Sequence, residues 1–518
     1  MTTSTTKQRQ TKRKQFSLWS ILVWLAVWQL ASMCLAYDIL LASPIRVVCC
    51  LCELLFTVSF WKAIGFTLLR IVLGFFLSLV GGVILSIFSY LWKPVRQLLA
   101  LPIDVIKATP VASFIILILI WIPSRNLSVV ISFLMAFPVL YTNLLQGLDS
   151  MDEKLLSMAK VFRLPFPKKC RFLYLPQIFP YFQAACSLAL GFCWKAGIAA
   201  EIIGLPSGSI GEKLYEAKIY LNTPEVFAWT ITVILLSILF EKAILFVLQL
   251  AANILARTCS QENKKIPVAK FLSKEDGKLS ACRKPQVVAT EKNLSFTHED
   301  FSSMKESSSH KDTSYRKEQT LRKDSFIIRD VSKSFQNEKV IAGFSYTLEA
   351  GNRTCLMGKS GCGKTTLLSL LMGLTKPDSG EIILPKNCKM SAVFQENRLI
   401  ENLSALSNVK IVTDLSKRYS TKDILFYFQK IGIDATDQKP VSTYSGGMKR
   451  RVAILRALLA DADFILMDEP LKGLDEETKD DVIALILLLT DKKTFLMTTH
   501  DRTEAEKLHA KTVNLTAY

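Results

Sequence analysis

The sequence predicts an all-α membrane domain with six membrane-spanning helices, followed by an α/β domain. The chain has 518 residues, which is too long for one hydrophobic core. Half of its residues are hydrophobic although 21% are charged, and its mean hydropathy is +0.28, so the apolar residues are expected in separate blocks. These blocks lie before residue 256, and short β-branched segments alternate with helical patterns after residue 326.

The net charge of +19 raises the question of a nucleic-acid partner. The basic residues, however, concentrate at the edges of the apolar blocks and in one polar stretch, rather than on a stripe with interleaved aromatic residues. We therefore expect membrane lipid, not nucleic acid, to be the partner of this charge. The twelve cysteines show no paired CxxC spacing for zinc and are interpreted as unpaired.

Six apolar stretches are long enough to cross a bilayer core of about 30 Å, which takes about 20 helical residues. The expected spans are residues 18–37, 63–91, 98–121, 127–147, 177–204 and 226–254. The loops after the even-numbered spans hold more Lys and Arg than the opposite loops. The positive-inside rule therefore places both chain ends and the α/β domain in the cytoplasm.

With these spans assigned, the sequence predicts that the chain has four parts. They are a basic N-terminus (1–15), a membrane domain (16–255) with a loop at 149–176, a linker (256–325) and the α/β domain (326–518). The linker holds fifteen Lys or Arg, ten Asp or Glu and eleven Ser, without apolar periodicity. Such a segment cannot bury enough apolar surface to order itself, so we predict a flexible tether.

A phosphate-binding loop motif lies between a predicted strand at 354–357 and a predicted helix at 366–372. Its candidate nucleotide-binding residues are Gly358, Ser360, Gly361, Cys362, Gly363, Lys364, Thr365 and Thr366. Glycines allow backbone N–H groups to wrap phosphates at a helix N-terminus, Lys364 can reach the outer phosphates, and Thr365 offers a hydroxyl to magnesium. The motif predicts ATP and Mg²⁺ as ligands.

A second motif is the apolar strand from Phe464 that ends in Asp468 and Glu469. A buried strand that ends in two carboxylates, downstream of a phosphate-binding loop, is typical of a nucleotidase. We expect Asp468 to hold magnesium and Glu469 to polarise the attacking water. The two motifs together predict a P-loop ATPase domain.

The segment Tyr444–Met448 reads Tyr-Ser-Gly-Gly-Met and resembles the LSGGQ signature of ATP-binding cassette proteins. In that family Ser445, Gly446 and Gly447 are implied to bind the γ-phosphate held by a second subunit, which implies a homodimer. Further elements resemble the family in the expected order. The resemblance implies that Phe335 stacks on adenine, Gln395 senses magnesium, Leu474-Asp475 crosses the dimer interface, and His500 contacts the γ-phosphate.

The loop at 149–176 resembles the coupling loop of importer permeases. Ser150 and Glu153 form a predicted capping box, and the helix they begin is expected to end at Pro165. Against the EAA, Gly, Leu-Pro pattern of such loops, the matching positions are Ser157, Met158, Ala159, Arg163, Leu175 and Pro176. The resemblance implies that this helix docks on the ATPase domain.

Residues 15–255 also resemble the permeases of the nitrate, sulfonate and taurine uptake family. The resemblance rests on Ser43-Pro44, Phe137-Pro138-Val139, Gly147-Leu148, Ala199-Ala200-Glu201 with Gly204, and the segment 222–229. It implies import of a small anion, sulfonate or vitamin-precursor-like solute that an extracytoplasmic binding lipoprotein delivers. Lys195 and Glu201 are ionisable residues within a span, where a structural pair and a role in the pathway are equally open.

Two other interpretations remain open at this stage. Six spans followed by one cassette is also the layout of a half-exporter, although the loops between the spans are short for the cytoplasmic helical extensions of exporters. The second alternative is a membrane regulator that responds to ATP but does not transport. Glu469 and His500 argue against a role in nucleotide sensing alone.

Overall fold

The computed structural model describes residues 18–35, 40–264, 325–336, 338–414 and 418–515, so most of the expected linker lies outside the described residues. The chain divides into two compact units. The first comprises residues 1–151 and 174–256, and the second comprises residues 152–173 and 257–518. The loop that follows the fourth expected span therefore belongs to the same compact unit as the α/β domain.

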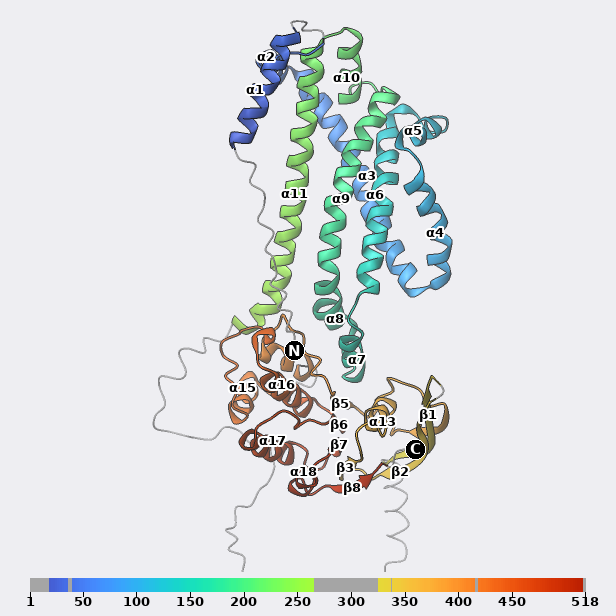
Figure 1. Cartoon of the computed structure of the whole chain (residues 1–518), viewed down its shortest axis with the longest axis vertical. Coiled ribbons are helices and arrows are strands. Elements are labelled where there is room, and N and C mark those ends of the chain that lie inside the picture. The colour runs from blue at the N-terminus through green and yellow to red at the C-terminus, as the bar shows by residue number, and fades with distance from the viewer. Residues whose placement is uncertain (1–17, 36–39, 265–324, 337, 415–417, 516–518) are drawn as a thin grey trace, which may run out of the picture. The chain divides into compact units, whose positions relative to one another are not determined.

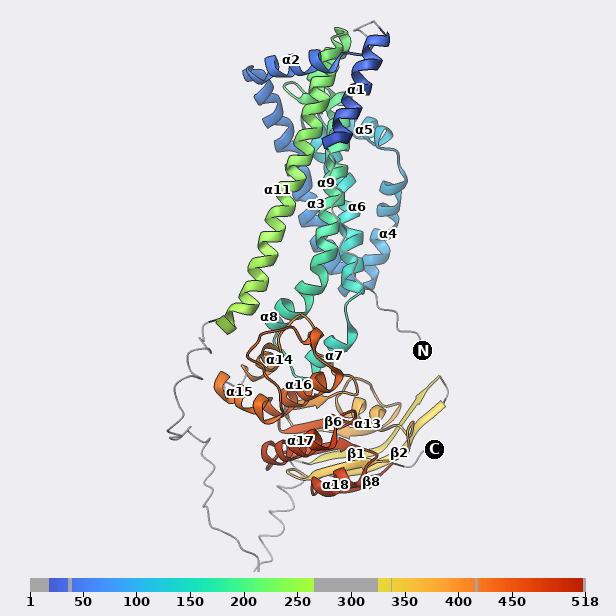
Figure 2. The same cartoon turned by 60° about the vertical axis from the view of Figure 1, so that its left-hand side comes forward.

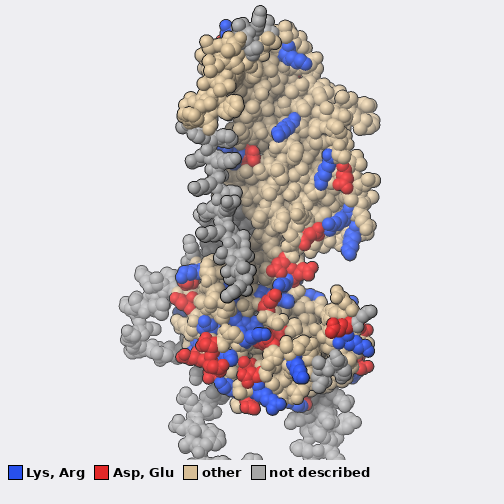
Figure 3. Space-filling view, in the orientation of Figure 1, with Lys and Arg blue, Asp and Glu red and all other residues tan. Residues whose placement is uncertain are grey.

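The first unit is all α (Figures 1 and 2). Its helices are α1 (Leu18–Leu35), α2 (Pro44–Leu55), α3 (Val58–Leu91), α4 (Lys93–Ala108), α5 (Val111–Leu119), α6 (Ser124–Asp149), α9 (Leu175–Gly204), α10 (Ile210–Ile219) and α11 (Thr223–Lys264). Figure 3 shows that the visible face of these helices is mostly uncharged. A helix whose exposed side chains are apolar requires an apolar solvent, as in a membrane.

Where the structure describes them, the six expected spans fall on helices, but only four helices are long and apolar enough to cross a membrane, or five if the bent pair α4–α5 counts as one span. Within the described residues, α3, α6, the segment Phe166–Gly204 and the first part of α11 are long and apolar enough to cross a membrane. The third expected span is broken instead of continuous, because α4 and α5 meet at an angle of 106°. Pro110 lies at that break, where it disfavours helical backbone in the preceding residue. The apolar part of α1, Leu22–Cys34, is shorter than the others.

The core of the first unit lies where α3, α6 and α9 pack together. Small residues allow these helices to approach closely, as is common in membrane bundles. A Cβ on Gly74 of α3 would meet the backbone oxygen of Val129 at 2.6 Å, and one on Gly197 of α9 would meet Ser132 Oγ at 2.7 Å. The contact region is also polar, because Ser132 Oγ donates to the backbone oxygen of Cys193.

The second unit contains two sheets. Five parallel strands stand in the order β5–β6–β7–β3–β8, and three antiparallel strands in the order β2–β1–β4. The strands are β1 (Phe326–Phe335), β2 (Glu338–Leu348), β3 (Arg353–Met357), β4 (Ser379–Ile383), β5 (Met390–Val393), β6 (Phe464–Asp468), β7 (Thr494–Thr498) and β8 (Lys511–Asn514). Every residue of β6 and β7 is buried, as expected for a parallel sheet covered on both faces.

Helices accompany these strands as the alternating sequence pattern predicts. They are α7 (Glu153–Val161), α8 (Phe166–Lys169), α13 (Lys364–Leu371), α14 (Ala405–Thr413), α15 (Thr421–Lys430), α16 (Gly446–Leu459), α17 (Glu476–Leu489) and α18 (Arg502–Lys507). Because β3, β6 and β7 are adjacent and parallel, the loops after their carboxyl ends meet at one edge of the sheet. In open α/β sheets this edge is where ligands bind.

Candidate nucleotide site and coupling loop

The phosphate-binding loop lies between β3 and α13. Gly361 and Gly363 have φ angles of 85° and 93°, which favour glycine. At Gly363 a Cβ would also meet the backbone oxygen of Val340 at 3.0 Å, so the loop leaves no room for a side chain there. Lys364 opens α13 and is 6% exposed. Its Nζ donates to the backbone oxygens of Gly358 (2.7 Å) and Lys359 (2.9 Å), which fixes the loop around the cation.

The remaining predicted residues of this loop differ in exposure. Ser360, Gly361 and Thr365 are exposed and Thr366 is half-buried, so their hydroxyl and N–H groups are accessible to a ligand. Cys362 is 2% exposed and packs beneath the loop. Its side chain therefore supports the loop, and its backbone N–H donates to the backbone oxygen of Lys359 at 3.3 Å.

The two carboxylates at the end of β6 have different environments. Asp468 is 3% exposed, and its Oδ1 accepts from Thr498 Oγ1 of β7 at 2.7 Å. Glu469 adopts a φ of 44°, and its backbone N–H donates to Thr498 Oγ1 at 2.9 Å. This left-handed turn immediately after the strand is an uncommon backbone state for a non-glycine residue, and such states concentrate at functional sites.

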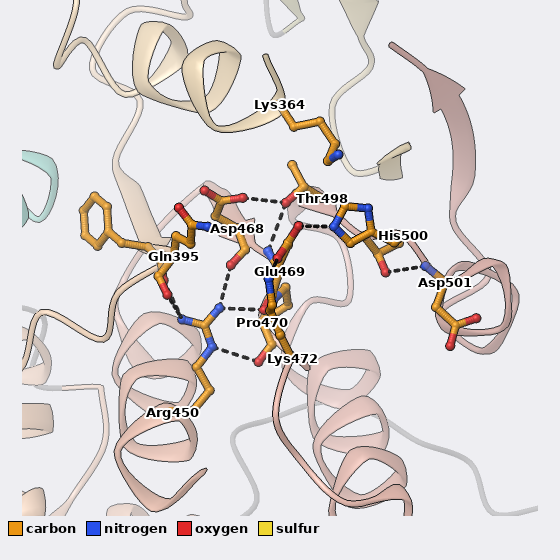
Figure 4. Close-up of polar contacts among 12 residues, drawn as sticks. Lys364, Gln395, Arg450, Asp468, Glu469, Pro470, Lys472, Thr498, His500 and Asp501 are labelled. Carbon is orange, nitrogen blue, oxygen red and sulfur yellow. Dashed lines mark hydrogen bonds and ion pairs between the residues drawn. The ribbon is translucent and has the colours of Figure 1, made fainter. Parts of the chain in front are cut away.

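Glu469 contacts two basic side chains (Figure 4). Its Oε1 pairs with His500 Nε2, and its Oε2 pairs with Lys472 Nζ at 2.8 Å. Burial alone would raise the pKa of Glu469, but the hydrogen bond from Lys472 and the proximity of His500 lower it below its ordinary value. The structure thus brings together Glu469 and His500, two residues that lie on separate strand ends.

Arg450 organises the backbone around these carboxylates, and the motif analysis did not single it out. It lies on α16 and is 5% exposed. Its guanidinium group donates to five backbone oxygens, those of Phe394, Gln395, Asp468, Glu469 and Pro470. Burial lowers the pKa of Arg450 to about 10, so it remains charged at neutral pH. The local sequence gives no signal for this burial, because Arg450 stands between Lys449 and Arg451.

The other residues predicted to bind nucleotide lie at the edge of the group formed by Arg450, Asp468, Glu469 and His500, or apart from it. Ser445 is the N-cap of α16 and accepts from the Met448 backbone N–H at 3.3 Å. Gly446 and Gly447 follow it in the first turn. Phe335 ends β1 with 48% of its surface exposed, as a residue that stacks on a base requires. Gln395 is exposed just beyond β5.

The coupling loop differs from the prediction at its start. The N-cap of α7 is Asp152, whose side chain accepts from the Lys154 backbone N–H at 2.8 Å. The prediction of a capping box that begins at Ser150 is therefore wrong. Ser150 instead ends α6, and its Oγ donates to the backbone oxygen of Gly147. Asp152 is as good an N-cap residue as Ser and lies directly before the first helical residue.

The end of α7 also lies earlier than expected. The helix ends at Val161, before Pro165, because Arg163 takes a left-handed φ of 48°. This is the position at which the importer loop pattern has glycine. The turn is therefore kept although the glycine is replaced, at a cost of about 1 kcal/mol for a side chain in this conformation.

The apolar face of α7 is buried within the second unit. Met158 and Ala159 are each 1% exposed and belong to the same hydrophobic cluster as the α/β domain, together with Phe162. Ser157 is half-buried and Arg163 is exposed. Two lysines of the loop add polar contacts. Lys154 pairs with Glu396 at 2.8 Å, and Lys160 Nζ donates to the backbone oxygen of Gly373 at 2.7 Å.

A second arginine of α16 connects this loop to the segment after β5. Arg456 is 1% exposed, and its guanidinium group donates to the backbone oxygens of Arg398 (2.8 Å) and Asn397 (3.3 Å). The guanidinium carbon lies 5.3 Å from the centre of the Phe162 ring. Burial lowers the pKa of Arg456 to about 9. One helix thus contacts the carboxylate end of the site through Arg450 and the coupling loop through Arg456.

Comparison with known proteins finds a permease region followed by an ATPase domain in this chain. Residues 341–472 match the family described as ABC transporter. Residues 78–257 match the family described as binding-protein-dependent transport system inner membrane component. The chain is 34% identical over 206 residues to the ergothioneine transport ATP-binding protein of Helicobacter pylori (strain G27). The aligned region covers 37% of this chain and 96% of that protein.

Two further relatives carry different solute names. An aliphatic sulfonates import ATP-binding protein of Mesorhizobium japonicum is 36% identical, over 37% of this chain and 76% of that protein. A spermidine/putrescine import ATP-binding protein of Fusobacterium nucleatum subsp. nucleatum is 33% identical, over 34% of this chain and 51% of that protein. The chain spans about half the length of this polyamine relative. A solved dimeric bacterial ABC transporter cassette is 27% identical, covers 37% of this chain and 94% of its own, and has a TM-score of 0.33.

The second unit is therefore an ATP-binding cassette, and a permease domain precedes it in the same chain. The chain belongs to the ABC transporter family, as a fusion of an importer-type permease with its ATPase.

Proposed function

We propose that the chain is a half-transporter that homodimerises and uses ATP hydrolysis to import a small solute across a bacterial plasma membrane. The observation that carries the proposal is the burial of the importer-type coupling loop in the cassette through Met158 and Ala159. A loop held in the core of the ATPase unit can pass its movement to the spans that the loop connects.

The residues of the nucleotide site fit ATP and Mg²⁺. The loop before α13 offers backbone N–H groups at a helix N-terminus, and its turn at Gly363 leaves no room for a Cβ against Val340 of β2. Thr365 and Asp468 supply oxygen atoms, which magnesium prefers, and Gln395 supplies a third from the end of β5. Within the described residues no group of three or more His, Cys, Asp or Glu side chains is placed to hold a metal alone.

The chain's own residues then have separate tasks. Lys364 already points its ammonium group into the loop, where it balances the charge of the outer phosphates. The nucleotide-bound metal would neutralise the charge that develops on the phosphates. Glu469 remains ionised at neutral pH and orients the attacking water, while His500 holds the carboxylate from the other side. Ser445 and the following glycines of a second copy would close the site.

The proposal includes the direction of transport and its partners. The permease domain and the docked loop favour import, with an extracytoplasmic solute-binding lipoprotein that delivers a small anion, sulfonate or vitamin-precursor-like solute. Both chain ends and the cassette would lie in the cytoplasm. The decisive measurement is ATP-dependent uptake into vesicles with and without the binding protein. Accumulation without any binding protein, or efflux from the cytoplasmic side, would favour a half-exporter.

The shared site has its own test. Glu469→Gln keeps the shape of the side chain but removes the base, so the variant should bind ATP, hydrolyse it at least 100-fold more slowly, and form a stable dimer in ATP. Size-exclusion chromatography with light scattering in detergent would measure the dimer. A variant that remains monomeric in ATP would contradict both the role of Glu469 and the closure of the site by a second copy.

A further inference from the structure

Lys195 lies on an otherwise apolar exposed stripe of α9. The exposed residues of the stripe are Ala184, Leu188, Phe192, Lys195 and Ile202. Gly191 is half-buried within it, and a Cβ added there would meet no atom within 4 Å. The stripe therefore places one charge on a surface of small and apolar residues, inside a helix long enough to cross a membrane.

Lys195 falls near the middle of the membrane core when the end of α9 is taken as one boundary of that core. It precedes the end of the helix, Gly204, by nine residues, or about 13 Å at 1.5 Å per residue. In a core of about 30 Å this leaves about 17 Å to the opposite boundary. A lysine stem reaches about 6 Å, so the ammonium group cannot extend to either interface.

Neighbouring carboxylates do not neutralise Lys195 in the described part of the chain. No ion pair or hydrogen bond of its side chain occurs there. Glu201, six residues further on, is fully buried and is engaged elsewhere. Its Oε2 accepts from Thr67 Oγ1 at 2.7 Å and from the Gly211 backbone N–H at 3.4 Å. Lys195 and Glu201 lie on the same helix and do not pair with each other.

Lys242 on α11 provides a contrast. It is also exposed, but it follows the start of that helix, Thr223, by nineteen residues, or about 28 Å. An ammonium group there lies close to the far boundary of a 30 Å core and can extend into the interface. Lys195 has no such route, and a lysine on a lipid-facing surface at that depth is strongly unfavourable.

We propose that the Lys195 stripe of α9 lines a water-filled transport pathway and that its ammonium group holds the negatively charged group of the solute in transit. The inference rests on the proposed transport function and deepens it by assigning the charge of the solute. A sulfonate or carboxylate group fits this site. A polyamine does not, because a second cation would be repelled at the same point.

Cysteine accessibility in the full-length chain tests the proposal. Phe192→Cys places a thiol one helical turn from Lys195, and Gly191→Cys is a second reporter in case the first variant does not fold. The cysteines to replace by Ser in this background are Cys34, Cys49, Cys50, Cys52, Cys170, Cys259 and Cys282. Membrane vesicles are treated with sulfonatoethyl methanethiosulfonate, which is an anion, or with its trimethylammonium analogue, which is a cation.

The expected result is a preference for the anionic reagent, after each rate is divided by that reagent's rate with a free thiol in solution. A unit charge about 6 Å away in a water-filled path changes each rate by about threefold, so the ratio of the two normalised rates should favour the anion by about tenfold. Lys195→Gln should abolish this preference, and Lys242→Gln should leave it unchanged. Rate ratios that are the same with Lys195 and with Gln at that position would overturn the proposal.

Two reference positions complete the experiment. Ser207→Cys lies in the exposed turn after α9 and should react with both reagents, whereas Leu77→Cys lies on the apolar exposed face of α3 and should react with neither. If both α9 reporters are as inert as position 77, the stripe faces lipid and the proposal is wrong. ATP hydrolysis is measured in the same vesicles. Its absence would contradict the proposed function, while the rate ratio would still decide the role of Lys195.

Discussion

Arg450→Met should loosen the contact between the segment after β5 and the segment after β6, without removing any residue predicted to touch nucleotide. The guanidinium group donates to backbone oxygens on both sides, with Gln395 on one segment and Asp468 and Glu469 on the other. Five such bonds at about 1.5 kcal/mol each would sum to about 7.5 kcal/mol. Because released carbonyl groups recover part of this by bonding to water, we expect a loss of about 3 to 5 kcal/mol.

The predicted consequence for activity follows from the backbone of Glu469. Without Arg450, nothing on α16 holds the left-handed turn that aims the carboxylate, so ATP hydrolysis should fall at least tenfold. Arg450→Lys retains the charge but not the planar fork, and should lose about half as much stability. Hydrogen exchange of the full-length chain, read on peptides from 394–400 and 464–472, measures the local loosening.

Arg451 provides the matched control on the same helix. In the described part of the chain its guanidinium group donates to the backbone oxygens of Ile431 (2.6 Å) and Gly432 (3.4 Å), and not to the Asp468 and Glu469 backbone. Arg451→Met should therefore loosen the 431–433 region and leave exchange at 464–472 unchanged. If the two variants give the same exchange pattern and the same rate of hydrolysis, the organising role of Arg450 is refuted.

Three further predictions concern the loop and the catalytic carboxylate. Ala159 is 1% exposed, so Ala159→Glu would bury an unpaired charge and the coupling loop should separate from the cassette. ATP binding should persist, while uptake per ATP hydrolysed should fall at least tenfold. Arg163→Gly should be tolerated, whereas Arg163→Val should lose about 1 to 2 kcal/mol, measured by thermal unfolding, because a β-branched residue resists a φ of 48°. The lowered pKa of Glu469 means that it stays ionised, and its stabilising contacts persist, until the pH falls through that lowered value. The rate of ATP hydrolysis should therefore show no decrease that is due to protonation of Glu469 between pH 8 and about 5. An apparent pKa near 7 in the pH–rate profile that vanishes in Glu469→Gln would contradict the ionised state of Glu469.

The described structure shows how local motifs predict chemistry but not the contacts that position it. The loop before α13 was predictable because glycine, lysine and threonine at fixed spacing act within one turn of chain. Arg450 and Arg456 were not, because their partners lie between 18 and 59 residues away in the sequence. The apolar helical pattern around Arg456 indicates a buried guanidinium group, but not which carbonyl oxygens it meets.

Boundaries were less predictable than motifs for a related reason. Ser150 and Asp152 are both good N-cap residues, and the sequence alone does not choose between them. The choice depends on where α6 ends, and Ser150 is used there. Similarly, the third apolar stretch is long enough for one span, but the break at Pro110 divides it into α4 and α5.

The sequence by itself determined the class of each part of the chain. Apolar length, the spacing of glycines around Lys364, and the carboxylates after an apolar strand are local properties, and each has a physical meaning that survives any arrangement in space. Tertiary structure decided which distant groups share an environment. It placed His500 against Glu469, buried Met158 and Ala159 in the cassette, and left Lys195 exposed while it enclosed Glu201. Burial and pairing depend on neighbours that come from other segments, and so only the folded chain can assign them.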